Sequence, residues 1–145
     1  MLSTIIVERH RTTEQLNLLL ESLKAYPVGH IVSVPNKTAA GNLREALAAE
    51  GHASCNLSED LSPKARALRI HEFKTNGWRA LITDECQDDL PNAAHIFIFN
   101  ADEILPPEST PQASEGALLL LYARATERIV LCYENITREI QKIFG

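Results

Sequence analysis

The chain has 145 residues, of which 45% are hydrophobic and 23% are charged, a composition typical of one soluble globular domain. Its formal net charge of −5 lacks the basic excess that a free-standing nucleic-acid binder usually carries. No apolar run approaches the ~20 residues that cross a bilayer, and the polar N-terminal segment excludes a secretory signal. We therefore expect a cytoplasmic protein without membrane contact.

The residues that usually hold metals show no ligand pattern. The three cysteines, Cys55, Cys86 and Cys132, are far apart and form no CxxC motif, and the five histidines show no ligand spacing. An odd number of scattered cysteines is typical of a reduced compartment. We predict no zinc site and no cofactor.

The first half of the chain alternates between strand and helix patterns, which predicts an α/β domain with a mostly parallel sheet. Short strands are expected at 4–7, 30–34 and 53–56, and amphipathic helices at 12–26 and 38–50. Thr12 and Gln15 have the spacing of a capping box at the first helix. Ser62 as N-cap and Pro63 as first residue open a third helix.

The second half continues the same alternation. Strands are expected at 80–83 and 95–99, with an acidic loop between them. A long polar, proline-rich loop follows at 100–114, and loops of this length are usually functional or mobile. A helix at 115–125, a strand at 127–133 and a last helix ending at Phe144 complete the order.

The segment SPKARALRIHEFKTNGWRALITD, residues 62–84, has distinctive spacing. Its serine lies four residues before Arg66, Arg66 lies seven before Phe73, and an apolar strand ends in Thr83-Asp84. This segment resembles the start of the second RecA-like domain of superfamily 2 helicases, and the similarity in element order covers nearly the whole chain. The resemblance implies one RecA-like domain over residues 1–145, without a P-loop.

The resemblance also implies nucleic-acid contacts. In that family the strand end and helix start that correspond to Asn36, Lys37 and Thr38 touch phosphate. Thr83, which matches the family's fifth motif, is a further candidate for nucleic-acid contact. A helix N-terminus favours phosphate through its N–H groups and its dipole. The alternative interpretation of residues 35–38 is a plain turn with an N-cap.

Arg66 has two interpretations as well. It is a candidate nucleic-acid or partner contact, together with Arg69 one turn later. Alternatively, both lie on a solvated helix face and pair with neighbouring carboxylates of Glu59, Asp60 or Glu72.

Two of the family's motifs are altered. Asp89-Leu90-Pro91 resembles the end of the fifth motif, but Gln87 and Asp88 stand where the family has glycine, and the spacing from Thr83 is shorter. The arginine-finger pattern of the sixth motif is absent. Its nearest equivalents are Arg124 and Arg128, which are either ATP-site candidates or an exposed helix end and strand start. No GxxxxGK[ST] motif occurs, so the chain cannot cradle ATP phosphates by itself.

Carboxylates gather after two successive strands. The first group is Asp84, Glu85, Asp88 and Asp89, and the second is Asp102, Glu103 and Glu108. In a parallel sheet both groups fall at the edge where ligands usually bind. Three interpretations are open: a surface for a basic protein partner, a solvated loop region, or a divalent-metal site of an enzyme that uses Asp84, Asp88 and Asp89.

These observations favour two functions. The first is a non-catalytic helicase-like interaction module in a nucleic-acid-processing assembly, with a protein partner and weak binding of single-stranded nucleic acid at most. The alternative is the C-terminal half of an ATP-dependent helicase, which contributes nucleic-acid contacts and part of an ATP site that another domain completes.

Overall fold

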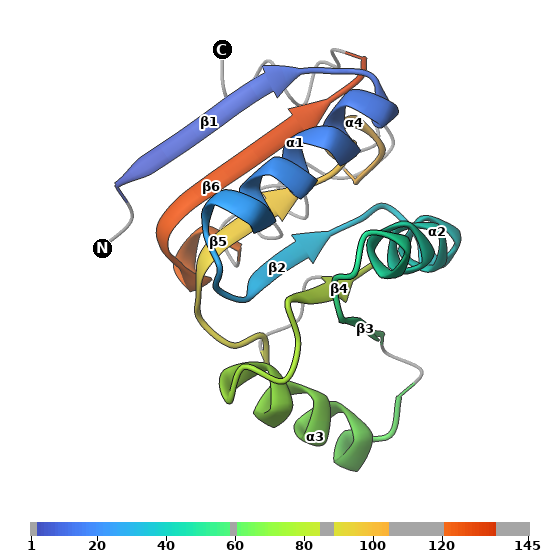
Figure 1. Cartoon of the computed structure of the whole chain (residues 1–145), viewed down its shortest axis with the longest axis vertical. Coiled ribbons are helices and arrows are strands. Elements are labelled where there is room, and N and C mark those ends of the chain that lie inside the picture. The colour runs from blue at the N-terminus through green and yellow to red at the C-terminus, as the bar shows by residue number, and fades with distance from the viewer. Residues whose placement is uncertain (1–2, 59–60, 85–88, 105–120, 136–145) are drawn as a thin grey trace.

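The computed structural model describes residues 3–58, 61–84, 89–104 and 121–135. Six parallel strands form one sheet in the order β1-β6-β5-β2-β4-β3, with helices packed against both faces (Figure 1). The elements are β1 (Thr4–Arg9), α1 (Thr12–Ala25), β2 (His30–Ser33), α2 (Lys37–Ala49), β3 (Ser54–Leu57), α3 (Pro63–Lys74), β4 (Ala80–Thr83), β5 (Ala93–Ile98), α4 (Ala101–Ile104) and β6 (Ala125–Tyr133). The predicted α/β class with a mostly parallel sheet is confirmed.

The centre of the sheet is apolar on both faces. All residues of β2 and β4 are buried, as expected for parallel strands covered by helices. Leu19 of α1 and Leu47 of α2 pack on one face, against Val32, Phe97 and other residues of the strands. The opposite face carries α3 through Phe73.

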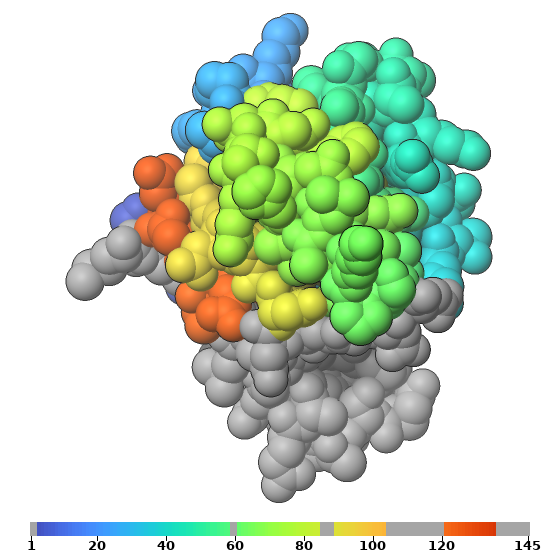
Figure 2. All heavy atoms as spheres, turned by 90° about the horizontal axis from the view of Figure 1, so that it is seen from below, coloured from blue at the N-terminus to red at the C-terminus, as the bar shows by residue number. Residues whose placement is uncertain are grey.

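Figure 2 shows this second face from below, with α3 in green between β5 and β6 on one side and α2 on the other. One close approach fixes the position of α3. A Cβ atom on Gly29 would lie 2.8 Å from Cε1 of Phe73, so glycine lets the ring pack directly on the start of β2.

Most predicted elements are found within a few residues of their expected ends. The capping box at α1 is wrong, because Arg11 occupies the N-cap position without a side-chain cap and the Gln15 side chain is fully buried. The N-cap role of Ser62 is confirmed, since its Oγ accepts a hydrogen bond from Ala65 N. The predicted loop at 100–114 begins with α4, and residues 105–114 lie outside the described residues.

At the predicted helix 115–125, residues 121–124 are helical and β6 already begins at Ala125. The remainder of that helix and the predicted last helix lie outside the described residues. Within the part of the chain that the structure describes, no helix is long and apolar enough to cross a membrane.

A stack of aromatic rings fills the amino edge of the sheet. His30 begins β2 and His95 lies near the start of β5, and their ring centroids are 5.0 Å apart. Tyr26 stacks on His95 at 4.4 Å, and the guanidinium of Arg128 lies 5.2 Å from the centre of the Tyr26 ring. Both histidines are almost completely buried.

The hydrogen bonds of His30 fix its protonation state. Nδ1 lies 2.9 Å from the carbonyl oxygen of Val28, which can only accept, so Nδ1 carries the hydrogen. Nε2 then accepts from the Ser22 hydroxyl at 2.9 Å, and Ser22 Oγ accepts from Arg128 Nη1 at 3.1 Å. This series of hydrogen bonds holds the imidazole ring neutral, and burial lowers the pKa of His30 to about 4.

We expect acid to destabilise the fold through His30. Below pH 6.5 the unfolded chain binds a proton at this histidine while the folded chain does not, so the stability that is present above pH 6.5 is lost as the pH falls toward 4. The loss should reach about 3 kcal/mol. Urea unfolding between pH 7 and pH 4 measures it.

The control for this measurement is the exposed His71. His30→Gln should flatten the pH dependence of the unfolding free energy, whereas His71→Gln should leave it unchanged. An unchanged pH dependence in His30→Gln would show that another group is responsible.

Candidate interaction edge of the sheet

The carboxyl ends of the strands gather the candidate residues along one edge of the sheet. β2 leads into Asn36, β4 ends at Thr83, and β5 leads into Asn100. Ser33 and Thr83 are register partners, and Val34 N donates to Thr83 O at 2.9 Å. Ligands of open parallel sheets usually bind at this edge.

The start of α2 combines a cap with exposed polar side chains. Asn36 is the N-cap, and its Oδ1 accepts from Ala39 N at 2.8 Å, so this residue has the structural role that the alternative interpretation predicted. Lys37 and Thr38 follow it and are exposed, and no acidic residue occupies the first turn. The positive end of this helix is therefore not neutralised by its own first turn, which suits an anion. Phosphate contact by these three residues stays a prediction.

The start of α3 has the same character. Ser62 caps it, Pro63 and Lys64 follow, and its first turn also lacks an acidic residue. β3 precedes α3, and in the sheet β3 is separated from β2 only by β4. The starts of α2 and α3, with Lys37 and Lys64, thus both lie at the carboxyl edge of the sheet.

Thr83 offers little surface to a ligand. Only 1% of this residue is exposed, and its carbonyl oxygen is bonded to Val34 N. The nucleic-acid contact predicted for Thr83 stays a prediction, and the geometry adds no exposed group in its favour.

Arg66 is buried and not solvated. Its Nε donates to Asp89 Oδ2 at 2.8 Å and its Nη2 donates to Asp89 Oδ1 at 2.7 Å, while Nη1 donates to Ser58 O at 2.7 Å. The expectation that Arg66 lies on a solvated helix face is therefore wrong, and its observed carboxylate partner is Asp89, 23 residues away. A guanidinium with these partners has few hydrogens left for phosphate, so the geometry does not add to its prediction as a nucleic-acid contact.

We call the carboxylates that follow β4, namely Asp84, Glu85, Asp88 and Asp89, the acidic rim. Asp89 differs from the others because its charge is paired with Arg66. The Arg66 hydrogen bond holds the pKa of Asp89 below its usual range. Asp84 is half-buried, and Glu85 and Asp88 lie outside the described residues. Among the residues that the structure describes, no group of three histidines, cysteines or carboxylates could hold a metal.

The second acidic group is also partly engaged. Asp102 is buried, and its two carboxylate oxygens accept from Glu134 N at 3.0 Å and Asn135 N at 3.3 Å. This aspartate therefore ties α4 to the end of β6. Glu103 beside it is exposed.

Arg124 and Arg128 lie at the opposite edge. Arg124 immediately precedes β6, and Arg128 is the register partner of His95, which lies near the start of β5. Arg128 is half-buried and engaged with Ser22 and Tyr26, so it is not solvated. An ATP site at the carboxyl edge gains no support from either arginine.

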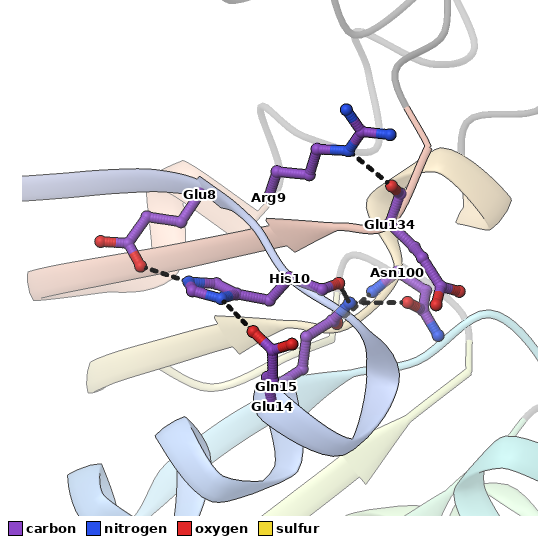
Figure 3. A network of polar contacts seen from close by, with 7 residues as sticks. All are labelled: Glu8, Arg9, His10, Glu14, Gln15, Asn100 and Glu134. Carbon is purple, nitrogen blue, oxygen red and sulfur yellow. Dashed lines mark hydrogen bonds and ion pairs between the residues drawn. The ribbon is translucent and has the colours of Figure 1, made fainter.

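A network of hydrogen bonds around Gln15 joins the start of α1 to the end of β1 and to the segment after β5 (Figure 3). The sequence did not reveal it. The buried Gln15 donates from Nε2 to His10 O and to Asn100 Oδ1, both at 2.8 Å, and its Oε1 accepts from Asn100 N at 2.9 Å. Asn100 also donates to Thr12 Oγ1 at 3.3 Å and has a positive φ of 45°. Asparagine adopts this left-handed backbone conformation more readily than most residues. An asparagine directly after a predicted strand was therefore the signal in the sequence for this turn.

We expect Arg66 and Asp89 to depend on each other for stability. Arg66→Ala and Asp89→Ala should each lower the unfolding free energy by about 1–2 kcal/mol, because each leaves a charged partner without its bidentate contact. The double variant should be more stable than the sum of the two losses predicts. Urea unfolding of all four proteins measures the coupling, and additive losses would contradict it.

The chain is similar to known proteins in its structure. No family model and no curated protein matches the sequence. Among solved structures, the C-terminal domain of S. cerevisiae Dbp5 bound to Gle1 is similar, with a TM-score of 0.74 and 21% identity over 100% of this chain and 86% of that chain. S. cerevisiae Dbp5 bound to RNA and ADP BeF3 has a TM-score of 0.73 and 20% identity, and covers 99% of this chain and 39% of that chain.

A bacterial structure is similar as well. The E. coli DEAD-box protein SrmB bound to RraA has a TM-score of 0.65 and 18% identity, over 92% of this chain and 78% of that chain. The order of strands and helices and the all-parallel sheet agree with this similarity. The chain therefore has the fold of the C-terminal RecA-like domain of DEAD-box helicases, the second such domain of superfamily 2 enzymes.

Proposed function

We propose that this helicase-like domain acts as an interaction module in a nucleic-acid-processing assembly and does not hydrolyse ATP by itself. The observation that carries this proposal is the charge of the segment that follows β4 and β5. Between Arg79 and Arg124 the sequence contains no lysine and no arginine. The same segment contains eight carboxylates: Asp84, Glu85, Asp88, Asp89, Asp102, Glu103, Glu108 and Glu115.

This charge pattern disfavours ATP chemistry. Phosphoryl transfer needs cations that stabilise the negative charge of the transferred group. A segment without lysine or arginine cannot supply an arginine finger, and Arg124 and Arg128 belong to the other edge of the sheet. The absence of a P-loop motif points the same way.

The same pattern suits a protein partner with a basic surface. Complementary charges steer two proteins together and select against wrong partners. Asp89 and Asp102 are engaged internally, so Asp84, Glu85, Asp88 and Glu103 are the carboxylates that we assign to partner contact. Solved domains of this fold are found with protein partners, as Dbp5 is with Gle1 and SrmB is with RraA.

We expect charge reversal at the rim to weaken binding of a basic probe. The double variant Glu85→Lys and Asp88→Lys should bind a fluorescent lysine-rich peptide at least about threefold more weakly than the control at low salt. Asp89 is left unchanged because it holds Arg66. Fluorescence anisotropy gives the affinity, and thermal unfolding checks that the fold survives.

The matched control reverses the charges of two exposed residues away from the rim and the groove, with Glu45→Lys on α2 and Glu127→Lys on β6. It changes the net charge by the same amount. If both double variants weaken binding equally, only the total charge matters and the rim is not the contact.

The alternative function, the C-terminal half of an ATP-dependent helicase, is favoured by the helix starts. Lys37 and Lys64 lie in the first turns of α2 and α3, where no carboxylate offsets the helix dipole. This arrangement suits phosphates of a single strand that runs along the carboxyl edge. Dbp5, which shares the fold, has been solved with RNA.

Single-stranded RNA at low salt tests this alternative. If the helix starts bind phosphate, Lys37→Ala should lower the affinity and reduce the slope of log affinity against log salt by about one. Lys24→Ala, at the last turn of α1, is the control and should change neither. Absence of any anisotropy change with the wild-type protein would remove this function for the chain alone.

A further inference from the structure

α1 and α2 cover the same face of the sheet (Figure 1). Residues of α1, together with residues of α2 or of the segment after α2, line two hollows, which we together call the groove. The first hollow, at the carboxyl edge, is a pocket of about 220 Å³. The pocket is lined by residues of both helices and of the segments that directly follow β2 and β5, among them Leu16, Val34, Leu43, Ala46, Phe99 and Asn100.

The base of the pocket is apolar, and hydrogen bonds hold the residues at its mouth in place. Leu43 and Phe99 are almost completely buried, and Leu16 is half-buried. Asn100 donates a hydrogen bond to Thr12, and the side chain of Gln15 makes two further hydrogen bonds with Asn100. Because the pocket is already formed and the residues at its mouth are held by hydrogen bonds, little conformational entropy of the domain is lost when a side chain enters it.

The other end of the groove has a different character. A second hollow of about 500 Å³ is lined by Asn17, Leu20, Glu21, Lys24, Glu50 and His52. Its two carboxylates outnumber its one lysine, so it favours a cation. Along α1 the two hollows are centred about seven residues apart, which is about 10 Å. An extended peptide covers this distance in about three residues.

We propose that this groove binds an extended segment of a protein partner. One large apolar side chain of the segment enters the first pocket, and a lysine or arginine about three residues away lies against Glu21 and Glu50. This proposal rests on the proposed function of the domain as a protein-interaction module, and it adds a second surface, separate from the acidic rim.

The lining favours a peptide over a nucleotide. Among the residues that the structure describes, none that lines the first pocket is charged. The second hollow would place Glu21 and Glu50 near a phosphate, which they repel. A buried apolar anchor surrounded by polar contacts is the usual centre of a protein interface.

Three synthetic peptides test the groove on the folded wild-type chain. The first is Lys-Ser-Ser-Trp-Ser-Ser-Lys, which presents a basic residue three positions from tryptophan in either chain direction. The second replaces both lysines by glutamate, and the third replaces tryptophan by serine. Methyl NMR of Leu16, Val34 and Leu43 follows the first pocket, and amide shifts of Leu20 and Glu21 follow the second hollow.

The first peptide should give saturable shifts at both ends of the groove. The glutamate peptide should bind at least about fivefold more weakly at low salt, and the serine peptide should not shift the pocket methyl groups. Ala46→Leu fills the pocket and should reduce affinity at least about tenfold, whereas Ala48→Leu, at an exposed position of the same helix, should not.

Three results would overturn the proposal: no saturable shift with any peptide, equal binding of the lysine and glutamate peptides, or stronger shifts of the same methyl groups with adenosine monophosphate. The last result would identify a nucleotide pocket. These outcomes are separate from the test of the acidic rim, since the peptides report on the groove through local shifts and Glu85 and Asp88 are unchanged.

Discussion

All six strands run in the same direction, and this constraint organises the distribution of charge. Each connection must bring the chain back from the carboxyl edge to the amino edge, so α1, α2 and α3 all begin at the carboxyl edge. Their positive ends therefore lie at the edge where β4 and β5 also end, and the sequence that follows those two strands is rich in carboxylates. The amino edge receives the stacked rings of His30 and His95 and the guanidinium of Arg128 instead.

Charges at the carboxyl edge divide into those that hold the fold and those left to meet other molecules. The Arg66–Asp89 pair joins α3 to the segment before β5, and Asp102 binds backbone N–H groups after β6. A carboxylate with such partners adds little to the attraction of a distant cation. The number of acidic residues in the sequence therefore overstates the charge that can attract a partner. Asp89 and Asp102 have to be subtracted from that number.

Local signals predicted the fold well, and long-range contacts explain the errors. The apolar runs of β2 and β4 and the serine cap of α3 depend on neighbours in sequence, so they were found. Gln15 looked like a capping residue because its true partner, Asn100, is 85 residues away. Arg66 was assigned to nearby carboxylates for the same reason. The groove between α1 and α2 could not be predicted, because it depends on how two helices lie on the sheet.

The carboxylate of Asp102 has a consequence for how such a domain can diversify. By holding the backbone of Glu134 and Asn135, it ties α4 directly to the end of β6, while the register of β5 and β6 is set by the strands themselves. The neighbouring strands are thus joined at this end by a side-chain contact in addition to their own pairing. Because one side chain makes this contact, a domain of this frame can change the position of the short helix after β5 without changing the strand pairing.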